Sequence, residues 1–102
     1  MQFVIFAYDG TDEGAFERRM SVRPRHLENM AKVKEMGTVI CAGGLLNEEG
    51  RMIGSMLVLD LPSRAELDKY LAGEPYIEAK VWKDVKIENF NTVLLNNEKF
   101  AK

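Results

Sequence analysis

The chain has 102 residues, 46% of them hydrophobic, and its 14 basic and 16 acidic residues give a formal net charge of −2. This size and apolar content predict one compact domain with a core of its own, and the nearly balanced charge argues against nucleic-acid binding as a primary role. A single cysteine excludes an intramolecular disulfide and a cysteine-based metal site. No apolar stretch approaches the roughly 20 residues that span a bilayer, so we expect no membrane partner and a cytoplasmic location.

The first predicted element is a strand over residues 2–8, which are rich in aromatic and β-branched side chains and are followed by a turn signal. A helical region over 11–36 comes next. We expect it in two pieces, with Ser21 as the N-cap of the second piece and Pro24 in its first turn, where no intrahelical acceptor is needed for the amide. Gly37 then ends the helix.

Two more strands are predicted over 38–46 and 51–61, with a polar turn between them. A second helix follows the third strand. Ser63 and Glu66 have the spacing of a capping box at its start, and it runs to about Gly73.

The last predicted strand covers residues 81–90, where apolar and polar side chains alternate. Residues 96–102 read as a polar tail behind a single domain of residues 1–95. The order β-α-β-β-α-β is that of the ferredoxin-like α+β fold, an antiparallel sheet with both helices on one face.

Both faces of this sheet are expected to be mostly apolar. Alternation along the first strand places on one face Phe3, Ile5 and Ala7, and on the other Val4, Phe6 and Tyr8. A sheet with one face in water shows a cleaner alternation of apolar and polar residues. We therefore predict a homodimer in which the free sheet faces of two subunits pack together.

The only histidine, His26, is the main candidate for chemistry. Helical spacing puts it on one face with Met30 and Val33, and Arg23 lies nearly on the same side. A titratable ring and a fixed cation would then lie together at the margin of the core, where proton transfer near neutral pH is available. The alternative is a structural histidine that bonds to a backbone carbonyl.

The neighbouring arginines are interpreted differently. The cluster is flanked by acidic residues and consists of Arg18, Arg19, Arg23 and Arg25. Mixed charges of this kind are typical of a solvated helix face, which is the interpretation that we favour for the cluster.

Glu74 offers a carboxylate in the turn after the second helix, and it reaches His26 only if the fold brings the two helix ends together. Tyr76 either supplies a hydroxyl or packs in the core. Gly43 and Gly44 either let a ligand approach the strand or mark a β-bulge. No phosphate-binding loop or paired metal-ligand motif occurs, so we expect no cofactor and no metal.

The chain resembles the YCII-related (YciI-like) family, which shares the dimeric α+β barrel superfamily with muconolactone isomerases. The resemblance covers residues 1–94. It rests on the final predicted strand and on five further segments, which are Phe3–Tyr8, Arg18–Leu27, Cys41–Leu45, Gly54-Ser55 and Gly73–Tyr76.

The resemblance implies a ferredoxin-like homodimer with a His–Asp dyad in a cleft. The histidine of the dyad corresponds to His26, and the aspartate corresponds to Glu74, a departure that keeps the charge and adds a methylene. One characterised branch of the family removes chloride from a chlorinated hydroxyhydroquinone.

These expectations combine into a cofactor-independent lyase or isomerase acting on a small cyclic or phenolic acid. His26 would be the general acid or base, and Glu74 would orient it. Arg23 would hold an anionic oxygen, and Ser55 and Tyr76 would donate hydrogen bonds. The alternative is a non-catalytic module that binds a small metabolite, which needs no coupled histidine–carboxylate pair. A monooxygenase is disfavoured, because one histidine cannot both ligate a haem and transfer a proton.

Overall fold

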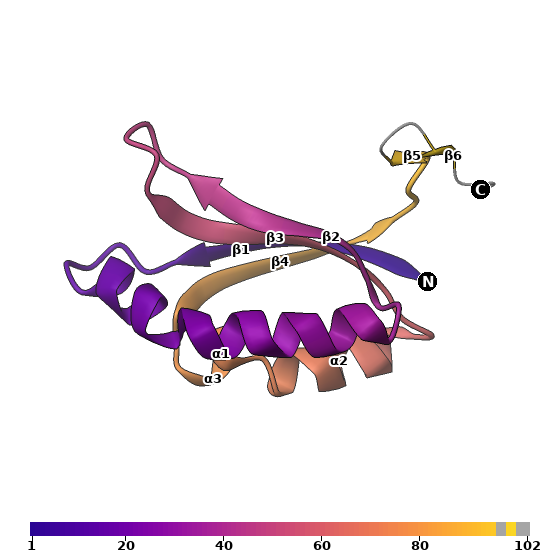
Figure 1. Cartoon of the computed structure of the whole chain (residues 1–102), viewed down its shortest axis with the longest axis horizontal. Coiled ribbons are helices and arrows are strands. Elements are labelled where there is room, and N and C mark those ends of the chain that lie inside the picture. The colour runs from indigo at the N-terminus through magenta and orange to yellow at the C-terminus, as the bar shows by residue number, and fades with distance from the viewer. Residues whose placement is uncertain (96–97, 100–102) are drawn as a thin grey trace.

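The computed structural model describes residues 1–95 and 98–99. Three helices lie on one face of a four-stranded antiparallel sheet with strand order β2-β3-β1-β4 (Figure 1). The main elements are β1 (Gln2–Asp9), α1 (Ala15–Glu35), β2 (Val39–Leu46), β3 (Met52–Asp60), α2 (Arg64–Ala72), α3 (Pro75–Glu78) and β4 (Trp82–Phe90). The predicted ferredoxin-like α+β fold is confirmed.

The first helix differs from the prediction. It begins four residues later than expected and is one helix, α1, with Pro24 in its interior rather than in the first turn of a second piece. Ser21 is not an N-cap, because its hydroxyl donates to the carbonyl of Arg18 one turn earlier (2.9 Å). Gly37 ends the helix as predicted, and its φ of +75° is a conformation that glycine adopts without strain.

The second helical region also contains an unpredicted element. α2 begins as expected, with the Ser63 hydroxyl accepting from the amide of Glu66 (3.2 Å). After Gly73, Pro75 starts a further short helix, α3, and Glu74 is its N-cap. Proline suits the first position of a helix, because that amide has no intrahelical acceptor.

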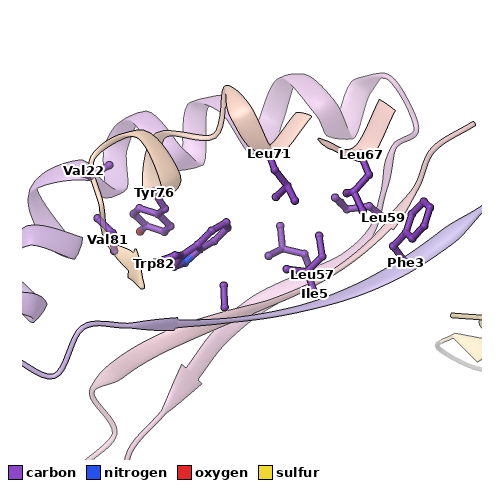
Figure 2. Packing of buried hydrophobic residues seen from close by; sticks show 11 residues of the cluster. Phe3, Ile5, Val22, Leu57, Leu59, Leu67, Leu71, Tyr76, Val81 and Trp82 are labelled. Carbon is purple, nitrogen blue, oxygen red and sulfur yellow. The ribbon is translucent and has the colours of Figure 1, made fainter. Parts of the chain in front are cut away.

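The core lies between the helices and the sheet. On β1, Phe3, Ile5 and Ala7 face the helices and are at most 1% exposed. Figure 2 shows Tyr76 and Trp82 side by side at one end of this core, whereas Phe3 lies at the opposite end. The candidate site residues described below surround the aromatic end.

The other face of the sheet carries no helix (Figure 1). On it Val4 pairs with Val58 and Phe6 pairs with Met56, so apolar side chains continue across the central strands as the alternation predicted. Of the tail expected over 96–102, residues 96–97 and 100–102 lie outside the described residues. Glu98–Lys99 form strand β6, which pairs with β5 (Leu94–Leu95). No described helix has the length and apolar character needed to cross a membrane.

A substitution at Gly54 tests how closely the central strands β1 and β3 pack. A Cβ at this position would lie 2.5 Å from the backbone oxygen of Ala7, whereas a Cβ at Gly43 would meet nothing within 4 Å. We expect Gly54→Ala to lower the free energy of unfolding by about 1–3 kcal/mol, because the backbone of β1 has to shift. Urea denaturation measures the change, and Gly43→Ala is the matched control, expected to unfold at the midpoint of the unsubstituted protein or above it. Equal midpoints for both variants would contradict the close approach.

Candidate functional site

His26 and Glu74 lie 48 positions apart in the sequence and meet in the structure. The imidazole Nδ1 is 2.7 Å from the Oε1 of Glu74. Glu74 is fully buried and His26 is 8% exposed, so water contributes little to either group. The packing of α1 against α3 brings the two side chains together.

Two further groups donate to the Glu74 carboxylate. The backbone amide of Tyr76 donates to Oε1 (3.0 Å), which is the capping bond of α3, and the hydroxyl of Tyr70 donates to Oε2 (3.0 Å). A buried carboxylate is stable only when such donors replace its water. Glu74, which is one methylene longer than the aspartate that the family resemblance implies, therefore has hydrogen-bond donors for both of its carboxylate oxygens.

These partners decide the charge of the carboxylate. Burial raises the pKa of Glu74, but the hydrogen bond and charge of His26, the Tyr76 amide and the Tyr70 hydroxyl outweigh burial and bring the pKa below its ordinary value. Burial and the nearby Glu74 carboxylate raise the pKa of Tyr70, so its hydroxyl stays protonated and continues to donate. Glu74 is ionised at neutral pH.

The imidazole is held in a defined plane and tautomer. Its ring stacks on Tyr76 with 4.0 Å between ring centroids, and Trp82 approaches edge-on at 6.0 Å. Because the ionised Glu74 only accepts hydrogen bonds, Nδ1 carries the proton when the ring is neutral, and Nε2 then has a free lone pair. Within the described residues, Nε2 has no hydrogen-bond partner.

A second buried polar cluster lies two helical turns along α1 from the first. Arg19, two turns before His26 on α1, is 3% exposed and donates to both carboxylate oxygens of Asp9 (2.9 and 3.2 Å). Its other terminal nitrogen donates to the hydroxyl of Ser55 (2.8 Å), which also accepts from the indole N–H of Trp82 (3.3 Å). This cluster joins α1 to β1, β3 and β4.

The interpretation of the arginine cluster as a solvated face is therefore wrong for Arg19, which is buried with Asp9. Arg18 and Arg23 are half-buried, and Arg25 is exposed. Helical spacing explains the difference, because Arg19 and Arg23 fall on the stripe of α1 that turns toward the sheet.

A pocket of about 310 Å³ opens between this stripe and the edge of the sheet. Its walls come from α1, β2, β3 and α3, and its lining includes Arg23, His26, Gly43, Ser55 and Tyr76. Five of the six residues predicted for the site therefore line one pocket, and the sixth, Glu74, lies behind the histidine.

The glycines and Tyr76 have more specific positions than the sequence allowed. Gly43 and Gly44 line the pocket, and the register shifts of β2 fall beside them rather than at them, so the β-bulge interpretation is wrong there. The ring of Tyr76 packs on His26, and its hydroxyl is buried without a hydrogen-bond partner within residues 1–95.

Sequence reasoning missed Tyr70, Asp9, Arg19 and Trp82. Only Arg19 carried a usable signal, its spacing of seven residues from His26 on one helix face. Across the described ranges, no group of three or more His, Cys, Asp and Glu side chains is arranged to hold a metal ion.

The lowered pKa of Glu74 predicts a pH-dependent stability. Since the native carboxyl binds a proton less readily than the unfolded one, ionised Glu74 stabilises the fold above its unfolded pKa, and this stability is lost as the pH falls through the native pKa. We expect Glu74→Gln to lower the free energy of unfolding by about 2–4 kcal/mol near pH 6 and by clearly less near pH 3. Urea unfolding at the two pH values measures this.

Glu78→Gln is the control for this experiment, because Glu78 is exposed on the same short helix. Its effect should be small and the same at both pH values. A Glu74→Gln penalty that does not change with pH would contradict the ionised, hydrogen-bonded carboxylate.

Comparisons with known proteins agree with this fold. The chain is 29% identical over 99 residues to Protein YciI of Escherichia coli O6:H1, covering 91% of this chain and 99% of that protein, and an uncharacterized protein of Haemophilus influenzae is 28% identical over the same shares. Among solved structures, 5-chloro-2-hydroxyhydroquinone dehydrochlorinase from Burkholderia phenoliruptrix, in complex with 2,5-dihydroxybenzoquinone, has a TM-score of 0.78 at 21% identity and covers 89% of this chain and 94% of its own. An antibiotic biosynthesis monooxygenase has a TM-score of 0.51 at 19% identity, covering 92% and 100%.

The two solved structures are similar to this chain in fold alone. The family assignment rests on a match between the sequence and a family model. The family model of the YCII-related domain matches residues 1–91, nearly all of the described chain. The chain belongs to the YCII-related family.

Proposed function

We propose that this protein is a cofactor-independent lyase or isomerase that transfers a proton on a small cyclic or phenolic acid. The observation that carries the proposal is the His26–Glu74 pair, in which Nδ1 is bonded to a buried, ionised carboxylate. That arrangement leaves Nε2 as the proton-accepting atom of a side chain that lines the pocket.

The proposed step uses the pair as a general base and acid. Nε2 of His26 takes a proton from the bound ring, and the imidazolium that forms is stabilised by the charge of Glu74. In an elimination, the electron pair of the broken bond to hydrogen forms the new double bond. Chloride leaves with the electrons of its carbon–chlorine bond. The net loss is HCl. In an isomerisation, the same proton returns to another atom of the ring.

The charges around the pocket favour an anionic ligand. Arg19 is neutralised by Asp9, whereas Arg23 is half-buried at the pocket and has no ion-pair partner within the described residues. An unpaired guanidinium beside an apolar wall suits a carboxylate or phenolate oxygen on a ring. Arg23 is therefore the proposed anion-binding residue.

The comparisons supply a compatible reaction. The dehydrochlorinase of similar fold acts, by its name, on 5-chloro-2-hydroxyhydroquinone, a chlorinated phenolic ring.

The free thiol of Cys41 is compatible with the reducing cytoplasm, which is the proposed location.

Turnover tests the proposal directly. We expect the protein to release chloride from 5-chloro-2-hydroxyhydroquinone, or to exchange a ring hydrogen of that compound with deuterated water. Since general acid–base catalysis contributes about 10²–10⁴-fold, His26→Asn should lose about that factor, and Glu74→Gln should lose at least about tenfold. Chloride release and NMR exchange, measured without oxygen, give both rates.

Arg25→Gln is the control, because Arg25 is exposed on the same helix and does not line the pocket. Its rates should equal those of the unsubstituted protein. If the unsubstituted protein binds the compound but neither releases chloride nor exchanges hydrogen, the protein is a metabolite-binding module and the proposed catalysis is wrong.

A homodimer through the free sheet faces is a further part of the proposal. The support is the pair Phe6 and Met56, which are half-buried side chains on the sheet face that no helix covers, whereas Val4 and Val58 beside them are at most 8% exposed within the subunit itself. We expect Phe6→Glu to give monomers in sedimentation velocity, because a charge at this position would be buried between the sheets.

Met36→Glu is the matched control for the dimer. Met36 is 76% exposed at the end of α1, away from the sheet, so a charge there should leave the dimer intact. Dimers that persist in Phe6→Glu would rule out this face as the interface.

A further inference from the structure

Ser55 is the most constrained hydroxyl at the pocket. It is 3% exposed, it lines the pocket, and its oxygen accepts from Arg19 Nη2 (2.8 Å) and from Trp82 Nε1 (3.3 Å). Neither partner can exchange roles with it, because a guanidinium and an indole N–H only donate.

The two bonds determine what the hydroxyl has left to offer. A serine oxygen has two lone pairs and one proton. Both lone pairs are directed at the two donors, so the proton is the one remaining hydrogen-bonding group. Nothing in residues 1–95 accepts that proton. Arg19 cannot turn away to relieve the constraint, because Asp9 holds its other terminal nitrogen with two bonds.

We infer that Ser55 donates its hydroxyl proton to an oxygen of the ligand that acts only as an acceptor, namely a phenolate, enolate or carbonyl oxygen. Two donors, one of them cationic, withdraw charge from the serine oxygen and make its proton a stronger donor. Arg19 and Trp82 are positioning residues for this bond, while Ser55 itself contacts the ligand.

This inference depends on the proposed function only for placing the ligand in this pocket. It assigns a different chemical role to each of three groups that line the pocket. His26 presents the atom that accepts a proton, and Arg23 presents a positive charge without an ion-pair partner in the described residues. Ser55 presents a donor whose oxygen has no lone pair left to accept from an O–H or N–H group. A ring bound there has its acceptor oxygen at β3, and an amine at the same position would leave two donors facing each other.

Binding of two matched rings that do not react tests the inference separately from catalysis. The probes are 2,6-dichlorophenolate, which has a single acceptor oxygen, and 2,6-dichloroaniline, which has N–H donors at the same position. The single tryptophan is part of the cluster, so its fluorescence reports binding. We expect the phenolate to bind better than the aniline, and Ser55→Ala to reduce this preference by about tenfold or more.

Ser55→Thr is the conservative variant, since it keeps the hydroxyl on a strand, and it should retain the preference within about threefold. Ser21→Ala removes a hydroxyl from the exposed side of α1 and should change nothing. Arg23 is present in every variant, so its attraction for the anion cancels in the comparison.

Loss of the preference in Ser55→Ala and its retention in Ser55→Thr would support the inference. An unchanged preference in Ser55→Ala, or equal binding of both probes by the unsubstituted protein, would overturn it. Either result leaves the proton-transfer proposal to its own test, because neither probe has to react. A thermal unfolding curve of Ser55→Ala with one transition, together with native tryptophan emission, shows that the variant tested is folded.

Discussion

The arrangement of the helices depends on one buried carboxylate. Glu74 is fully buried, and an ionised carboxylate in such a place costs several kcal/mol unless hydrogen bonds replace its hydration. The donors come from three different elements, with His26 on α1, Tyr70 on α2 and the amide of Tyr76 on α3. The requirement to satisfy this one group therefore fixes the relative positions of all three helices, and it holds the histidine at the pocket.

Asp9 is a second buried acid that pairs with a side chain of α1. Asp9 at the end of β1 neutralises Arg19, and Glu74 neutralises His26 when the ring is protonated, so two buried cationic positions two turns apart on one helix each have an acid from elsewhere in the chain. Stability and the proposed chemistry then come from the same stripe of side chains. Pairing in the interior demands good geometry, which keeps the rings and the guanidinium from adopting alternative positions.

The sequence was sufficient for the fold and for part of the site. Alternation in β1 and the order of elements predicted the ferredoxin-like sheet, because these signals are local and have a definite period. Helical spacing placed His26 and Arg23 on one face for the same reason. The contact of Glu74 with His26 spans 48 positions, and no local pattern reports such a contact.

The failures have the same physical origin. Pro24 looked like part of the first turn of a second helix piece, but α1 runs unbroken from Ala15 to Glu35, with contacts to β1, β2 and α3 along its length. Arg19 looked solvated because its neighbours in the sequence are charged, whereas its surroundings in space are Asp9, Ser55 and the ring of Tyr76. Tyr70 gave no signal at all, since a tyrosine on an amphipathic helix is most often a packing residue.

The glycines of β2 give the pocket one wall that is made of backbone. Because β2 is an edge strand and a Cβ at Gly43 would meet nothing within 4 Å, the protein tolerates a side chain there without rearranging its core. Such a side chain would occupy space in the pocket. Under the proposed function, one substitution on β2, a strand that carries neither buried ion pair, would change the size of the ring that fits and leave the proposed proton-transferring groups in place.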